Sequence, residues 1–224
     1  MCGRTALTSS PEELQEVFGL DETPELAAHF NVPPSQPVAV IRTPGKLEWL
    51  RWGLVPFWAE DAKIGHRLVL ARAETVYTAA AFRDAIRRHR CLVVVSGFYE
   101  WKRETRTASK PFFVRRTDGL PFALAGVWDK WISPDGEIVE SCAIVTAPAK
   151  PPLDAIHGRM PMILDRAAWL PWLDRATGDV SGLLRGASDG LLAFPVGPYV
   201  NDPRHDDAQC VRMDPGGLQR ELFA

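Results

Sequence analysis

The chain has 224 residues, 46% of them hydrophobic, and a formal net charge of −2. This length suits one large domain with a sizeable core. The near-zero net charge excludes a bulk polycation, so any nucleic-acid binding must come from a local basic patch. Of the 26 basic residues 20 are arginines, which suit phosphate, although a GC-rich genome would enrich arginine equally well.

The first expected element is a helix. Ser9 or Ser10 caps it, Pro11 and two glutamates form its first turn, and its apolar positions run to Phe18. Residues 31–34 should be extended, because two consecutive prolines preclude a helix there.

The rest of the chain is predicted to be rich in strands. Strands are expected at residues 38–41, 47–52, 91–101, 111–116, 121–131 and 138–146. Helices are expected over residues 76–90 and 165–173, and the chain from residue 196 should be irregular. Because short strands outnumber helices without regular βαβ alternation, we expect an α+β fold. Its core should be mostly antiparallel or mixed and barrel-like, with peripheral helices, in one domain over residues 1–224.

The cysteines indicate a reducing compartment. The four are Cys2, Cys91, Cys142 and Cys210, without a C-x-x-C pair or zinc-ligand spacing. The first 20 residues lack a signal-peptide pattern, and no apolar stretch approaches the length of a membrane span. We expect a soluble cytoplasmic protein without a metal or cofactor. No glycine-rich phosphate loop and no G-x-S-x-G is present, which disfavours nucleotide and serine hydrolases.

Cys2 follows the initiator methionine directly. Methionine aminopeptidases remove Met1 when the second residue is small, which would expose a thiol and an α-amine on one carbon. Such a 1,2-aminothiol closes on an aldehyde to give a durable thiazolidine ring, whereas an amine alone gives a hydrolysable imine. The α-amine titrates near ~7.7–8.0, so a useful fraction is unprotonated at neutral pH.

Two other residues are candidates for acid–base chemistry. Glu100 ends an apolar strand and lies between aromatic residues, a setting that suits a proton carrier for an amine or a carbinolamine. A structural pair with a neighbouring arginine is the alternative. His157 follows a proline-containing loop and precedes Gly158, and loop histidines with rigid neighbours are good catalytic candidates.

Three further residues are candidates for binding. Trp52 lies in an aromatic segment that could stack on bases or pack in the core. Arg72 could hold a phosphate with Glu74 orienting it, or form a solvated ion pair. Asn31 could bind a ligand, although shaping its turn is the favoured role.

Taken together, these segments resemble the SOS-response-associated peptidase (SRAP) family of abasic-site processing proteins. The matching segments are Met1-Cys2-Gly3-Arg4, Asn31-Val32-Pro33-Pro34, Trp52-Gly53-Leu54-Val55-Pro56, Ala71-Arg72-Ala73-Glu74-Thr75, Gly97-Phe98-Tyr99-Glu100-Trp101, Ile144-Val145-Thr146 and Ile156-His157-Gly158-Arg159-Met160-Pro161. The seven segments occur in the same order as in the family, which makes the resemblance specific.

The resemblance implies a protein that binds single-stranded DNA, or single/double-strand junctions, at abasic sites, and we expect it to be a monomer. Cys2 would capture the sugar aldehyde as a thiazolidine crosslink, Glu100 would move protons, and His157 would help open the sugar hemiacetal. A self-processing peptidase activity on Met1 and an abasic-site lyase activity are implied as well. The DNA contacts would be Arg4, Asn31, Trp52, Arg72 and Arg159. The protein would act in the bacterial cytoplasm, on the nucleoid during DNA damage.

One position departs from the family. Leu70 stands where the family has asparagine, two residues before Arg72. Leucine cannot hydrogen-bond the sugar. One hydrogen bond to a reacting group typically contributes a few kcal/mol at most, so we expect reduced activity rather than none.

Two other functions are compatible with these residues. An N-terminal-nucleophile peptidase would use Cys2 to attack an amide with its own α-amine as base, but it needs an oxyanion hole that no motif identifies. A non-catalytic module that senses abasic DNA would follow if the change at Leu70 had removed the chemistry.

Overall fold

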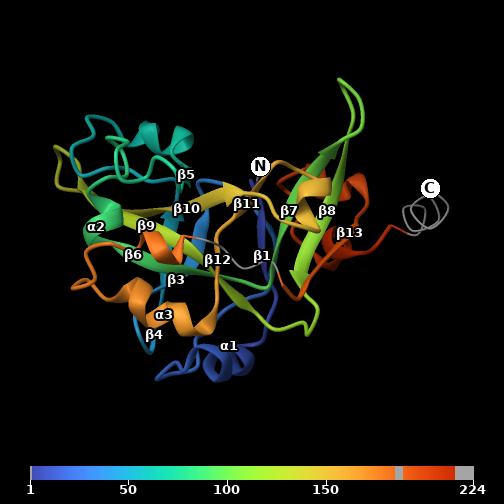
Figure 1. The fold of residues 1–224 in the computed structure, drawn as a ribbon, viewed down its shortest axis with the longest axis horizontal. Coiled ribbons are helices and arrows are strands. Elements are labelled where there is room, and N and C mark those ends of the chain that lie inside the picture. The colour runs from blue at the N-terminus through green and yellow to red at the C-terminus, as the bar shows by residue number, and fades with distance from the viewer. Residues whose placement is uncertain (1, 185–188, 215–224) are drawn as a thin grey trace.

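The computed structural model describes residues 2–184 and 189–214. Five strands close into a barrel in the order β10-β4-β3-β6-β9, with β9 pairing back to β10. All neighbouring pairs are antiparallel except β10 and β4. The barrel occupies the middle of the molecule (Figure 1). Its strands are β3 (Pro37–Thr43), β4 (Lys46–Trp52), β6 (Arg90–Val95), β9 (Phe122–Ile132) and β10 (Ile138–Pro148).

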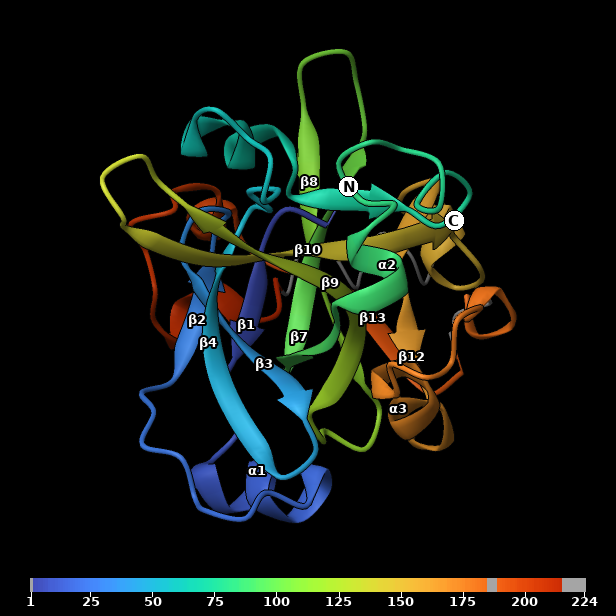
Figure 2. The same ribbon diagram turned by 90° about the vertical axis from the view of Figure 1, so that its left-hand side faces the viewer.

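Three short strands extend the barrel sheet, and a second sheet lies beside it with the order β13-β8-β7-β1-β2. The short strands are β5 (Leu70–Arg72), β11 (Arg159–Pro161) and β12 (Ile163–Leu164). The second sheet consists of β1 (Thr5–Leu7), β2 (His29–Val32), β7 (Gly97–Arg103), β8 (Ser109–Arg116) and β13 (Leu191–Pro195). Figure 2 shows the second sheet from the side, with β7 and β8 rising above the barrel.

The helices are short and peripheral. The α-helices are α1 (Pro11–Phe18), α2 (Ala85–Arg88) and α3 (Arg166–Leu173), and the 3-10 helices are η1 (Ala62–Arg67), η2 (Leu153–Ala155), η3 (Ser181–Leu183), η4 (Pro198–Asn201) and η5 (Ala208–Val211). Ser10 caps α1 in a reciprocal capping box with Glu13, as its sequence predicts. Among the described residues no helix is long and apolar enough to cross a membrane. The expected α+β fold with a barrel-like core is confirmed.

Successive side chains of each barrel strand point to opposite faces of the sheet, and both faces are buried. Val93 and Leu124 pack in one cluster with Cys2, whereas their neighbours Leu92 and Ala123 pack in another cluster with residues of all three α-helices. Because helices can cover only the outside of a closed barrel, the cluster that contains Cys2 fills the inside.

Two predicted elements are wrong. Most of residues 76–90 form turns, and only α2 is helical. Val76 and Phe82 are buried six residues apart, a spacing that one face of a 3.6-residue helix does not provide, while Arg83, which would share a face with Val76, is exposed.

The strand expected over residues 91–101 is two strands, β6 and β7, in different sheets. The chain leaves the ladder at Ser96, whose hydroxyl accepts hydrogen bonds from the main-chain nitrogens of Thr8 (2.8 Å) and Ser9 (3.0 Å). This break carries the chain from the barrel to the second sheet.

Burial of a thiol inside the barrel predicts a pH-dependent stability. Burial raises the pKa of Cys142 from 9.0 to about 12. Between these values the folded state holds a proton that the unfolded state has lost. The contribution of Cys142 to the free energy of unfolding is therefore fully present below pH 9. Above pH 9 it falls by about 1.4 kcal/mol per pH unit. Urea unfolding at several pH values should show the free-energy advantage of wild type over Cys142→Ala shrinking above about pH 9. A constant difference would contradict this assignment.

Candidate active site

The site is built where the N-terminal segment meets strand β7. The main-chain nitrogen of Cys2 donates a hydrogen bond to Oε1 of Glu100 over 2.6 Å. Cys2 and Glu100 are 98 positions apart in the sequence. The antiparallel pairing of β1 with β7, in which Thr5 lies opposite Phe98, brings them together. Both are buried, with Cys2 0% and Glu100 1% exposed. A carboxyl group thus contacts the atom that would become the α-amine once Met1 is removed.

The thiol of Cys2 is held neutral. Burial, and then the charge of Glu100, raise its pKa well above the usual value. A neutral thiol is a weak nucleophile, so its proton must leave during a reaction. The same carboxyl group therefore contacts the main-chain nitrogen of Cys2 and raises the pKa of its thiol.

Segments from two other parts of the sequence pack against the cluster that contains Cys2. Leu70 and Ile156 are half-buried and pack against the cluster that contains it. Leu70 is placed by strand β5, which pairs in parallel with β10 in the register of Leu70 with Ile144. The position at which the sequence departs from the family therefore lies beside the barrel interior and offers only apolar contact.

His157 lies one residue beyond Ile156, in the loop between η2 and β11. Its Nδ1 lies 3.0 Å from the main-chain nitrogen of Arg159 and 3.1 Å from the carbonyl oxygen of the same residue. The main-chain nitrogen of His157 donates to the carbonyl of Leu153 over 3.0 Å. These bonds fix the half-buried ring beside the segment that packs on the Cys2 cluster.

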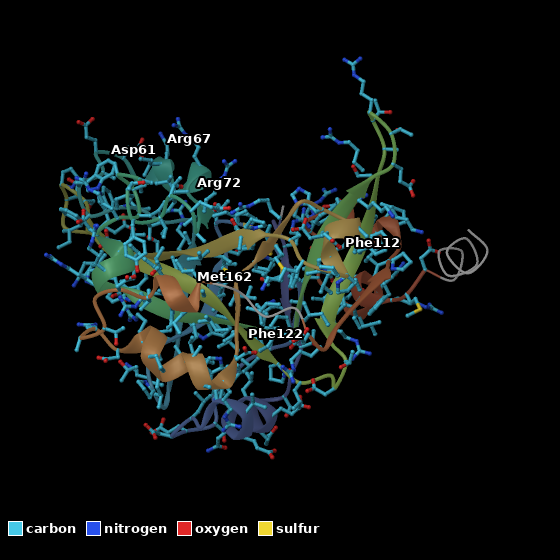
Figure 3. All side chains as sticks on the ribbon, viewed as in Figure 1. Asp61, Arg67, Arg72, Phe112, Phe122 and Met162 are labelled. Atoms are coloured by element: carbon cyan, nitrogen blue, oxygen red, sulfur yellow. The ribbon has the colours of Figure 1, made fainter. Side chains whose placement is uncertain are left out.

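Arg159 and Glu74 form an ion pair next to this loop. Nη2 of Arg159 donates to Oε2 of Glu74 over 3.0 Å and to the carbonyl of Thr146 over 2.7 Å. The hydrogen bond from Arg159 lowers the pKa of Glu74. Glu74 thus pairs with Arg159 rather than with Arg72. Arg72 is exposed, and Figure 3 shows it with Arg67 at one edge of the molecule.

Arg4 and Asn31 form an internal clamp. Nη1 of Arg4 donates to Oδ1 of Asn31 over 2.7 Å and to the carbonyl of Val200 over 3.0 Å. The buried Nδ2 of Asn31 contacts the carbonyls of Val200, Asp202 and His205. Asn31 therefore fastens the C-terminal segment to β2, and the favoured structural role fits this arrangement better than ligand binding.

Trp52 does not offer a stacking surface. It is 0% exposed, its indole nitrogen donates to the carbonyl of Val69 over 2.9 Å, and it packs with the barrel interior. The prediction that Trp52 contacts DNA is therefore wrong for this arrangement. The same aromatic segment carries Phe57 and Trp58, which are exposed, at 59% and 45%. Both follow Pro56, beyond the last residue of β4.

Among the described residues no three His, Cys, Asp or Glu side chains gather as a metal site.

Comparison with known proteins defines the family. The model of the family "SOS response associated peptidase (SRAP)" matches residues 1–203. The chain belongs to the SRAP family. It is similar to the abasic site processing protein YoqW of Bacillus subtilis, with 35% identity over 221 residues that cover 94% of this chain and 99% of YoqW. It is also similar to the mouse abasic site processing protein HMCES, with 29% identity over 195 residues, 72% of this chain and 55% of HMCES.

Crystal structures agree with the SRAP assignment at the level of the fold. A protein from Bacteroides thetaiotaomicron superposes with a TM-score of 0.86 over 95% of this chain and 100% of its own, at 23% identity. A phage-related protein from Bordetella bronchiseptica superposes with a TM-score of 0.70 at 26% identity, over 87% of this chain and 94% of its own.

Proposed function

We propose that this protein processes abasic sites in DNA by forming a covalent thiazolidine crosslink through Cys2 after removal of Met1. The observation that carries the proposal is the 2.6 Å contact between the Cys2 nitrogen and the Glu100 carboxyl group, both buried. The names of the curated relatives, abasic site processing proteins, support the substrate class.

The reaction needs only the two atoms of Cys2 and the aldehyde of the ring-opened sugar. The α-amine adds to the aldehyde carbon and gives a carbinolamine. Loss of the hydroxyl group as water leaves an iminium, and the sulfur adds to its carbon and closes the ring. The sum is aldehyde plus aminothiol giving thiazolidine plus water.

Glu100 accounts for the proton movements in these steps. As a carboxylate it accepts a proton when the amine adds, and it returns that proton to the departing hydroxyl group. It then accepts the thiol proton as sulfur attacks, which offsets the raised pKa of Cys2. His157 assists opening of the sugar hemiacetal.

The binding partner we propose is single-stranded DNA, or a junction of single and double strands. Arg72 is exposed on β5, which pairs with β10 beside Leu70. Arg67 ends η1 on the same edge of the molecule (Figure 3). An arginine edge beside the reacting cysteine suits a ligand that carries a phosphate on each side of its sugar. We propose further that the protein acts as a monomer on the bacterial nucleoid. The single-domain organisation stays a prediction.

The proposal is tested with a single-stranded oligonucleotide that carries one abasic site. Purified protein should form an adduct that survives denaturing electrophoresis. An oligonucleotide with tetrahydrofuran at that position has no aldehyde and should give none. Reversible binding to both, without an adduct on either, would favour a non-catalytic sensor. Turnover of a peptide without any DNA adduct would favour a peptidase.

Replacing Leu70 with asparagine should accelerate crosslinking by up to about tenfold, because an amide can hydrogen-bond the sugar or the forming ring. The same change places a polar group beside the apolar Cys2 cluster and should lower the thermal midpoint. Leu70→Ala serves as the control, because it removes the leucine without adding a hydrogen-bonding group. Equal rates for the asparagine and alanine variants would show that a hydrogen bond at this position does not assist the reaction.

A further inference from the structure

Strands β7 and β8 form a basic arm that extends past the rest of the molecule. Residues 102–110, the outer part of this hairpin, contain four basic residues and one acidic residue. In Figures 1 and 2 the arm rises from the same edge at which the N-terminus and β5 lie. In Figure 1 the N-terminus lies between the arm on one side and β5, the strand that carries Arg72, on the other.

Two lysines of the arm are placed against each other. Lys102 and Lys110 are direct cross-strand partners in the antiparallel β7–β8 pairing. Like charges directly opposite each other destabilise a strand pair. Within the described part of the chain no acidic side chain forms an ion pair with either lysine. Among the residues that the structure describes, these two neighbouring positive charges therefore have no ion-pair partner.

The lysine pair lies on the face of β7 that points toward the site. Side chains alternate along a strand, so Phe98, Glu100 and Lys102 share one face. Phe98 packs in the cluster that contains Cys2, and Glu100 contacts the Cys2 nitrogen. A rise of about 3.4 Å per residue puts Lys102 about 7 Å beyond Glu100 along the strand.

The partner strand confirms this geometry. Phe112 is paired with Glu100, and Lys110 is paired with Lys102 one step farther out. The ammonium of Lys110 lies 5.8 Å from the ring centroid of Phe112, which is buried at the base of the arm (Figure 3). This cation–π contact directs Lys110 back along the face toward Glu100.

We propose that Lys102 and Lys110 form a phosphate-binding pair for the DNA backbone next to the sugar that reacts with Cys2. The inference rests on the proposed function. A phosphate bound between the two ammonium groups would neutralise their charges. It would replace the repulsion between the two lysines with attraction to a shared anion. Arg72 would hold the strand on the other side of Cys2, so that the backbone crosses the site from β5 to the arm.

The test is the salt dependence of binding by the Lys102→Ala/Lys110→Ala double variant. The probe is the tetrahydrofuran oligonucleotide, which binds without reacting. Each phosphate neutralised on a single strand contributes about 0.7 to the slope of log K against log salt, so loss of the one phosphate held by the pair should make the slope less negative by about 0.7. Loss of two charge-assisted contacts should also weaken binding at least about tenfold.

The control is Lys46→Ala/Arg166→Ala, which removes the same charge from the start of β4 and from the start of α3, at the opposite end of the molecule (Figure 1). It should retain the wild-type slope. Without DNA, the Lys102→Ala/Lys110→Ala variant should melt at or above wild type, because the opposed charges are gone.

An unchanged salt-dependence slope in the Lys102→Ala/Lys110→Ala variant would reject the proposal that this pair binds a DNA phosphate, even if wild type crosslinks normally. An equal change of slope in the control variant would reject it too. Absence of a wild-type adduct on abasic DNA would instead reject the proposed function, because the binding slope does not depend on the reaction.

Discussion

Replacing Cys2 with serine should abolish the adduct that survives denaturation. The serine variant keeps the α-amine and the contact with Glu100 but has no sulfur to close the ring, so the reaction stops at an imine that water reverses. Borohydride should still trap that imine as a covalent amine. The measurement is denaturing electrophoresis of protein and abasic oligonucleotide, with and without borohydride.

Cys142→Ala is the matched control for this experiment, because it removes another buried thiol from the same cluster. It should form the stable adduct at the wild-type level. A stable adduct in Cys2→Ser without borohydride would contradict ring closure through sulfur. Loss of the adduct in both variants would indicate damage to the barrel interior rather than to the chemistry.

Replacing Glu100 with glutamine should slow crosslinking by about 10²- to 10⁴-fold, which is the usual contribution of a positioned acid–base group. Glutamine has nearly the same shape and can still accept the hydrogen bond from the Cys2 nitrogen, but it cannot take up a proton. The final yield should approach that of wild type at long times. A single-turnover time course with excess protein measures the rate and the yield separately.

Glu140→Gln is the control, because Glu140 is an ion-paired carboxylate that contacts Arg42 instead of the site. Its rate should match wild type. Added formate should restore part of the rate of Glu100→Ala, since a small carboxylate can enter the space left by the side chain. An unchanged rate in Glu100→Gln would remove the proton-transfer role, and failure of formate to restore any rate would reduce Glu100 to a positioning residue.

The sequence alone was informative where local chemistry decides the structure. The cap at Ser10 and the positions of most strands were predictable, because each depends on residues close in the chain. The closed barrel depends on which strands pair over long distances. The pairing of β4 with β10 in parallel, across about 90 residues, leaves no local pattern.

The same distinction applies to the site. Cys2 and Glu100 were identified from the chemistry of their residue types, but their direct contact depends on the pairing of β1 with β7. Trp52 was misjudged because aromatic residues in a Gly-Pro segment look alike whether they face a barrel interior or solvent. The juxtaposition of Lys102 and Lys110 could not be predicted from the sequence, because it depends on the register of the β7–β8 hairpin.

The most direct test of covalent capture by Cys2 is the intact mass of the purified protein before and after incubation with an abasic single-stranded oligonucleotide. Before incubation the protein mass should lack Met1. After incubation it should increase by the mass of the oligonucleotide minus one water. Protein that has lost Met1 and gains no mass from abasic DNA, while binding it reversibly, would contradict covalent capture.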